Sequence, residues 1–581
     1  MKEHLNANKK CNIYQVVFIS VVSALAVLLF VLLKFGGGGY ETNNDRIINE
    51  ILSGAMTGQP DPHGVYINYM IGIFISGLYR ITKAVPWYGI FLLLCYVIIN
   101  SAVLTVILNK GKTKKEQVFL WFLGMLVTLC NIYIFTILHY TTISGAFAVA
   151  GYVWLLLDDQ KKRGYCIFGV FELLSILLRR DPMLMVQPIG MCVVGAFLLI
   201  KWMNKTINFK ECIAEIGRIL IPLVAVLVVF FVGNNIIGDY SSAEWRHYKQ
   251  YNDLRTQLSD FYGYPEYEEC KDVLDKYGVS ELEYYGVGRY YLLDNVLENE
   301  CMEELVSIAS ASYKEEHPVT LIGVLKRMIN YFRYDRCFGY EIAVPAMYLF
   351  VGLSFLFHKK WKEMLPIVVL FGSRYLIFAY LIIRGRITSG VINILFFAEL
   401  YLLLAIFVKS FFANREEVKR HNGIFYAASF IFVLLMSLAI SRSYTEADRV
   451  YAFNKDYETG IMRLYNYMED KKGGFIVCDE VTTYYMGTAL DTKRHQRQNS
   501  LVAGGWFYNS PMMNEAVRQY KQKYSDNMYC VVFKDVPAFD HSYVFELLPE
   551  KYDVTLKLED TLHWEEMGLS YEVYKLEGSI Q

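Results

Sequence analysis

The 581-residue chain lacks the common sequence signatures of zinc, nucleotide and nucleic-acid sites. Its eleven cysteines are scattered without CxxC or Cys/His zinc spacing. The formal net charge is -1, which argues against nucleic acid as a partner. The C-terminal part contains neither a P-loop nor a GxGxxG turn, so we do not expect nucleotide binding there.

The composition instead points to a membrane. Hydrophobic residues make up 54% of the chain and charged residues 20%. The hydrophobic share is too high for a soluble enzyme, and the charged share is too high for a protein made only of membrane helices. This balance predicts a polytopic membrane protein with sizeable aqueous parts. No small-residue cleavage site follows the first apolar run, Ile13–Leu33, so we expect a retained helix rather than a signal peptide.

Further apolar runs of near-spanning length follow, and together they predict an α-helical polytopic fold with about 11–12 membrane helices. The segment Val65–Ile81 would be the twelfth, but counting it as a span reverses the side of every later loop. We therefore favour a re-entrant or interfacial element there. The other runs are Trp87–Leu108, Val118–Leu138, Thr141–Leu157, Tyr165–Leu178, Leu184–Ile200, Ile219–Ile237, Ile342–Phe357, Leu365–Ile383, Ile387–Val408 and Ile424–Ile440.

Lys and Arg gather in alternate loops, which predicts the orientation in the plasma membrane. The basic connections, expected in the cytoplasm with the N-terminus, are Lys110–Lys115, Lys161–Arg163, Lys201–Lys210, His358–Lys362 and Arg415–Arg420. The chain then divides into an N-terminal transmembrane module (1–238, with a first outer loop at 35–64), an extracytoplasmic insertion (239–341), further membrane helices (342–440) and an extracytoplasmic C-terminal domain (441–581). The absence of a eukaryotic retention signal fits a bacterial plasma membrane.

The two large aqueous parts differ in pattern. The insertion is expected to be mostly helical, with helices around Lys271–Tyr277 and Asp294–Ser310. The C-terminal part reads as a small α/β or α+β domain, of which we favour the first. Its expected elements are strands at Gly474–Asp479, Tyr529–Phe533, Tyr552–Lys557 and Tyr571–Leu576 and a helix at Pro511–Tyr524.

The first outer loop, Gly36–Gly64, has the most distinctive pattern. Its interior predicts a short amphipathic helix on the outer face of the membrane, and Glu41, Asn44 and Asp45 lie around the start of that helix. Asn44 and Asp45 could simply cap the helix. We favour the alternative, in which Asp45 is an acid at the rim of a membrane-embedded cavity.

Other polar residues are expected on the same side of the membrane. They are His139 and Tyr140 in the second outer loop, Arg179, Arg180 and Asp181 in the third, and Arg384 and Arg386 in a later one. Arginine binds a lipid phosphate through its planar fork, and a nearby carboxylate can accept the proton of an attacking hydroxyl. Structural alternatives stay open: the arginines could anchor helix ends or pair with Asp181, and His139 could be a hydrogen-bonded interface residue. Glu172, Arg374 and Glu399, inside apolar runs, could be paired structural charges.

Several of these features together resemble the GT-C superfamily, multipass glycosyltransferases of the aminoarabinose-transferase and protein mannosyltransferase type. The resemblance rests on NNDRIINEILSGAMTG in the first outer loop, PDPHGVYINYMIGIFISGLYR after it, LLRRDPMLMVQP, and a helix after RGR. It implies an inverting transfer of sugar from a polyprenyl-phosphate donor to an envelope glycan or lipid acceptor. Asp45 would match the acid that serves as base or metal ligand, and Arg179 and Arg180 would match the phosphate contact.

Two departures leave the need for a divalent cation, Mg²⁺ or Mn²⁺, open. Family members that use a metal usually carry two acids in the first loop, whereas the neighbour of Asp45 is Asn44. His139–Thr142 occupies the place of another frequent acid, although Glu41 or His139 could substitute. Two other functions also remain: a transporter or flippase of lipid-linked saccharides, and a structural envelope protein with a degenerate site. A transporter would more naturally show internal repeats, and the sequence shows none.

Overall fold

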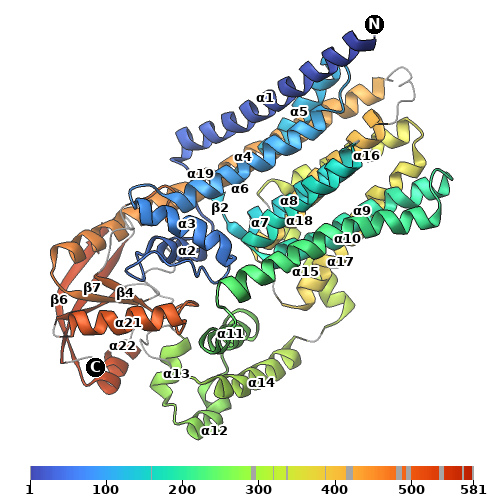
Figure 1. Cartoon of the computed structure of the whole chain (residues 1–581). Helices are drawn as coiled ribbons and strands as arrows, with labels where there is room; N and C mark the ends of the chain where they lie inside the picture. The colour runs from blue at the N-terminus through green and yellow to red at the C-terminus, as the bar shows by residue number, and fades with distance from the viewer. Residues whose placement is uncertain are drawn as a thin grey trace.

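Long helices running side by side dominate the computed structural model (Figure 1). Nine helices in the described part of the chain are long and apolar enough to cross a membrane, which confirms the polytopic α-helical class. They are α1 (Lys2–Phe35), α4 (Trp87–Leu108), α7 (Tyr140–Leu157), α9 (Arg180–Met203), α10 (Phe209–Phe231), α16 (Tyr340–Phe357), α17 (Met364–Ile383), α18 (Ser389–Val408) and α19 (Gly423–Asp470). The structure describes residues 2–158, 160–288, 296–317, 319–334, 338–385, 388–413, 423–478, 487–492, 499–525, 527–534, 542–565 and 568–578.

Two further helices, α5 (Lys114–Cys130) and α8 (Lys161–Leu178), lie within the bundle. The expected span Val118–Leu138 is wrong at its end, because α5 stops at Cys130 and is followed by the short α6 (Ile132–Thr136) and β2 (Ile137–Leu138). The Asn131 side chain at this break donates to the Val127 carbonyl (2.6 Å) and accepts from the Tyr340 hydroxyl (2.5 Å).

The segment Val65–Ile81 forms one short helix, α3 (Tyr69–Ile81), of 13 residues. At 1.5 Å per residue it is roughly 20 Å long, which is less than the roughly 30 Å of a bilayer core. It packs against α2 (Asn43–Ser53), α4 and α8. The helix is therefore too short to cross the membrane alone.

The basic connections meet at one end of the bundle. Lys161 pairs with Glu215, the Lys362 Nζ donates to the Asn204 side chain (2.5 Å), and the Lys409 Nζ donates to the Leu156 carbonyl (2.5 Å). The expected basic loop Arg415–Arg420 lies outside the described residues. The loops that carry the candidate site residues follow the opposite helix ends, as the alternation of loops predicts.

At the opposite end of the bundle, the loop that follows α1 packs into the interior of the protein. Gly36, Gly37 and Gly38 all have positive φ, and a Cβ on Gly38 would lie 2.0 Å from the Thr136 carbonyl oxygen. This close approach lets β1 (Gly39–Tyr40) pair in parallel with β2. The helix α2 is not exposed on the surface of the protein, because every residue from Asp45 to Ser53 is buried.

The insertion is helical, as expected. It contains α11 (Ala243–Thr256), α12 (Tyr267–Tyr277), α13 (Glu281–Gly288), α14 (Asn299–Glu316) and α15 (Leu321–Tyr334). The helix expected at Asp294–Ser310 begins at Asn299 and continues to Glu316, while Asp294 itself lies outside the described residues.

The C-terminal part is an α/β unit built on a five-stranded mixed sheet of order β4-β3-β5-β7-β6. Its elements are β3 (Gly474–Cys478), β4 (Ser500–Ala503), α21 (Pro511–Tyr524), β5 (Met528–Lys534), α22 (Ser542–Tyr552), β6 (Thr555–Trp564) and β7 (Leu569–Glu577). Two boundaries differ from expectation. Tyr552 ends α22 rather than starting a strand, and no helix break separates 440 from 441, because the last turns of α19 bury Tyr457, Ile461 and Leu464 against the sheet.

Candidate functional site

Asp45 lies in the first turn of α2 and is fully buried. Its Oδ1 accepts hydrogen bonds from the Tyr88 hydroxyl (3.0 Å) and the Tyr140 backbone N–H (3.1 Å). Its Oδ2 accepts from the His139 Nδ1 (2.6 Å) and, at 3.4 Å, from the Thr42 hydroxyl. Two bonds to each oxygen fill the acceptor positions of a carboxylate, so Asp45 joins α2, α4 and the start of α7.

His139 immediately precedes α7, and its two ring nitrogens, Nδ1 and Nε2, have different surroundings. Because a carboxylate oxygen can only accept, the Nδ1 of His139 is the donor in this hydrogen bond. Nε2 has no hydrogen-bond partner in the described part of the chain, and a Cβ on Gly390 would lie 3.1 Å from it. The ring therefore packs against the first turn of α18.

Glu41 meets the same turn of α18. Its backbone N–H donates to the Leu138 carbonyl (2.8 Å), and its Oε1 accepts from the Ser389 hydroxyl (2.6 Å). Glu41 is half-buried, in contrast to Asp45. Burial raises the pKa of Glu41, while the nearby His139 and the hydroxyl groups of Ser389 and Thr142 oppose that rise. This carboxyl group is thus the more accessible acid of the pair.

Arg179 lies between α8 and α9, and two hydroxyl groups and two aromatic rings contact its guanidinium. Its Nη1 donates to the Tyr140 and Thr141 hydroxyls, both at 2.7 Å. The rings of Tyr66 and Tyr140 lie 5.4 and 5.2 Å from its central carbon. No hydrogen bond from Nε or Nη2 occurs among the described residues, so the two parallel N–H groups of that edge are free. A phosphate accepts such a pair of N–H groups in bidentate fashion.

Tyr140 connects the acid to the guanidinium. Its backbone N–H binds Asp45 and its hydroxyl accepts from Arg179. The structure thus brings Asp45, Glu41, His139, Tyr140 and Arg179 together at one end of the bundle. We call these five residues the loop-end network.

Arg180 and Asp181 lie outside the loop-end network. The Arg180 Nε pairs with Asp181 at 3.2 Å, and the two side chains are 55% and 65% exposed. Arg180 instead faces α11: burial raises the pKa of Asp253, and the positive charges of Lys249 and Arg180 oppose that rise. The expected clamp of two adjacent arginines is therefore not formed, because consecutive residues at the start of α9 point in different directions.

The remaining candidates contribute little that the structure describes. Asn44 is half-buried, and its side chain makes no hydrogen bond within the described residues. Arg384 is exposed at the end of α17, 5.9 Å from the Tyr380 ring. Arg386 lies outside the described residues.

The donor set does not fit a divalent cation. Among the described residues, no three His, Cys, Asp or Glu side chains converge in a manner that could hold a metal. Asp45, the expected ligand, already accepts four hydrogen bonds, and Mg²⁺ or Mn²⁺ would have to displace them. We therefore derive no chemical step through a metal.

Aromatic residues that the sequence did not single out cover the Arg179 side of the network. Tyr66 packs against Trp506 of the C-terminal unit, with ring centroids 4.5 Å apart. The Tyr248 hydroxyl of α11 donates to the Trp506 carbonyl (2.8 Å). The insertion and the C-terminal unit thus both reach the loop-end network. With 46 tyrosines in the chain, composition gave no signal for choosing Tyr66, Tyr88 or Tyr248.

The charges inside the apolar runs form separate clusters. The Arg374 Nε pairs with Glu399 at 3.0 Å, and both side chains are buried, so the expected pairing of these two spans is confirmed. Glu172 is also buried and accepts from the Gln187 side chain (2.8 Å), which accepts in turn from the Tyr152 hydroxyl (2.7 Å). Neither cluster includes a residue of the loop-end network.

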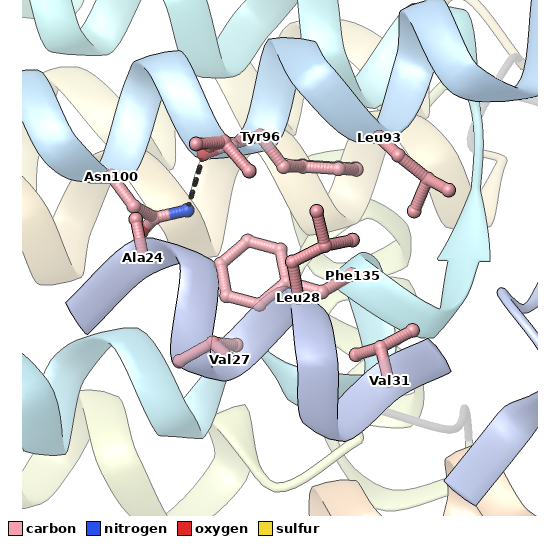
Figure 2. Close-up of a pocket in the computed structure, with 9 residues that line it drawn as sticks. Ala24, Val27, Leu28, Val31, Leu93, Tyr96, Asn100 and Phe135 are labelled. Carbon is pink, nitrogen blue, oxygen red and sulfur yellow. Dashed lines mark hydrogen bonds between the residues drawn. The ribbon is translucent and has the colours of Figure 1, made fainter. Parts of the chain in front are cut away.

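A small hollow between α1 and α4 is likewise separate (Figure 2). Its lining is mostly apolar: Ala24, Val27, Leu28, Val31, Leu93, Tyr96, Val97, Asn100 and Phe135. The side-chain amide of Asn100 donates a hydrogen bond to the Tyr96 carbonyl (2.8 Å). This hollow therefore offers little to a charged or polar ligand.

The loop-end network combines a fixed guanidinium, with one N–H edge that makes no hydrogen bond to the described residues, with a half-buried carboxyl group of raised pKa. The first feature suits an anion, and the second suits proton acceptance. A scan against protein-family models and a search of curated proteins both find no match to this chain.

Proposed function

We propose that this protein is an integral membrane glycosyltransferase. It transfers a sugar from a polyprenyl-phosphate-linked donor to an envelope glycan or lipid acceptor, with inversion at the anomeric carbon. The observation that carries the proposal is Arg179, whose Nη1 is fixed by two hydroxyl groups while its Nε/Nη2 edge makes no hydrogen bond to any residue that the structure describes. A lipid phosphate at that edge would lie beside the loop-end network.

The membrane arrangement belongs to the same proposal. The helices α5 and α8 span together with the nine candidate spans, which gives eleven spans and leaves α3 short of crossing. The N-terminus and the basic connections face the cytoplasm. The loop-end network, the insertion and the C-terminal unit face outward from a bacterial plasma membrane.

Each residue then has a role in one displacement step. The acceptor hydroxyl attacks the anomeric carbon as the bond from that carbon to the phosphate oxygen breaks. Glu41 accepts the hydroxyl proton, and Arg179 stabilises the negative charge that develops on the departing lipid phosphate. Asp45 orients His139 and the Tyr140 backbone, since its own acceptor positions are filled. We thus reassign proton acceptance from Asp45 to Glu41.

The test is sugar transfer by the purified protein in liposomes that contain a polyprenyl-phosphate sugar. We expect a glycosylated acceptor and free polyprenyl phosphate in equal amounts, with the opposite anomeric configuration by NMR. Movement of the intact donor between leaflets without cleavage would instead support the transporter alternative. Binding without either cleavage or movement would support the structural one.

A further inference from the structure

The amphipathic helix α15 (Leu321–Tyr334) carries an apolar face that the protein does not cover. Leu321, Ile322, Leu325 and Ile329 are 77%, 70%, 49% and 62% exposed. These positions lie within about 100° of one another on a helix of 3.6 residues per turn, so they form a single stripe. Val324 is only 9% exposed and marks the side of α15 that packs on the protein.

The helix that carries the stripe contacts a candidate membrane span. α15 packs against α17, a candidate membrane span (Figure 1). Val368 and Leu376 of α17 are themselves 61% and 72% exposed, as expected for residues that face lipid. The helix α15 therefore packs on a membrane span that has exposed apolar residues of its own.

Length and charge decide how α15 meets the lipid. Its 14 residues extend about 21 Å, too short to cross a core of about 30 Å. Lys326 is exposed beside the apolar stripe, and Arg327 is half-buried on the other side of the helix. No Asp or Glu occurs from Leu321 to Tyr334, so the helix is purely basic.

We propose that α15 lies in the plane of the membrane, with its apolar stripe among acyl chains and its basic residues against anionic lipid headgroups. It thereby anchors the helical insertion to the bilayer beside α17. The proposal does not depend on the glycosyltransferase activity. A second copy of this chain could in principle cover the same stripe, and the experiment separates the two occupants.

The experiment places photoreactive benzoylphenylalanine at Ile329 or, as a matched control, at the adjacent exposed Asn330. The full-length protein is reconstituted in nanodiscs of phosphatidylcholine with phosphatidylglycerol, illuminated and analysed by mass spectrometry. We expect at least about fivefold more lipid adduct from position 329 than from position 330, because only position 329 lies on the stripe. Equal yields, or a crosslinked dimer of this chain at position 329, would overturn the proposal.

A second pair of measurements tests the basic residues. The double substitution Lys326→Glu with Arg327→Glu is combined with the probe at Ile329. We expect the lipid adduct to fall at least about twofold in phosphatidylglycerol nanodiscs and to change little in pure phosphatidylcholine, because only the first lipid is anionic. An unchanged yield in both compositions would contradict the headgroup contact. A probe at Leu325 repeats the comparison if the Ile329 variant does not fold.

Discussion

Two charge clusters of this protein differ in burial and in the hydrogen-bonding groups that they leave unused. Glu399 is bound by Arg374 at 3.0 Å and by the Tyr348 hydroxyl at 3.0 Å, and three aromatic rings lie 4.7–4.8 Å from the guanidinium carbon of Arg374. In the loop-end network, two hydroxyl groups fix the Nη1 of Arg179, its Nε/Nη2 edge has no hydrogen bond within the described part of the chain, and Glu41 is half-buried.

The difference shows that a buried charge in a membrane protein does not by itself indicate a site. Arg374 and Glu399 neutralise each other between neighbouring helices, which is a structural solution. Among the described residues no carboxylate makes a hydrogen bond with the Arg179 side chain, and hydroxyl groups and aromatic rings hold it instead. A guanidinium held in this way can offer its remaining N–H groups to an anion.

The largest expected effect comes from breaking the closed pair. Arg374→Leu leaves Glu399 buried without its counter-ion, and we expect a loss of about 3–5 kcal/mol in the free energy of unfolding. Denaturation of the purified protein in detergent would measure it. The double variant Arg374→Leu with Glu399→Leu should recover most of the loss, whereas a double variant as unstable as the single one would contradict a paired structural role.

The second effect concerns the open guanidinium. Arg179→Ala should lower kcat/KM for sugar transfer by about 100- to 1000-fold, because the developing phosphate charge loses its fixed donors. Arg179→Lys keeps the charge but not the bidentate edge, so it should recover only part of the rate. If the unfolding midpoints of both variants are close to that of the unchanged protein, the loss of activity comes from the reaction step and not from unfolding. A rate within threefold of the original in Arg179→Ala would refute the assigned role.

The third effect concerns proton acceptance. Glu41→Gln should lower kcat by about 100-fold. Activity should fall as the pH drops through the raised pKa of Glu41, because only the ionised carboxylate accepts a proton. Ser389→Ala removes a hydrogen bond that favours the ionised form, so the acid limb should move to higher pH. A pH profile that is unchanged in Ser389→Ala would argue against Glu41 as the titrating group.

The smallest effect should come from the neighbouring arginine. Arg180 is exposed and already paired with Asp181, so Arg180→Ala should change kcat/KM by less than about twofold. Measured beside Arg179→Ala, it separates a specific contact from a general effect of positive charge. Equal losses in the two variants would restore the two-arginine clamp suggested by the sequence.

Apolar periodicity and basic loops predicted most of the fold. Runs of spanning length have few alternative structures, so the helices α1, α4 and α16–α18 lie close to their expected positions. The failures arise from tertiary contacts. Val118–Leu138 reads as one span, yet its last residues pair with β1. The segment α2 reads as a surface helix, yet the protein buries every residue from Asp45 to Ser53.

The candidate site was predictable as a group of loops but not as a geometry. Because the basic loops alternate, the sequence predicted that Glu41, Asp45, His139 and Arg179 lie on one side of the membrane. It could not show that the acceptor positions of Asp45 are filled, or that Arg180 turns away, since both depend on side-chain direction after folding. Tyr66 and Trp506 could not be predicted either, because an aromatic residue at a site has no distinctive spacing in the sequence.

The most direct test of the central claim is the binding of polyprenyl phosphate compared with that of the uncharged polyprenol of equal length. Both affinities would be measured by titration calorimetry in detergent, for the unchanged protein and for Arg179→Lys. We predict that the phosphate raises affinity at least about tenfold in the unchanged protein and that most of this gain disappears in Arg179→Lys. Equal affinities for the two lipids, or a gain that survives the substitution, would contradict phosphate recognition by Arg179.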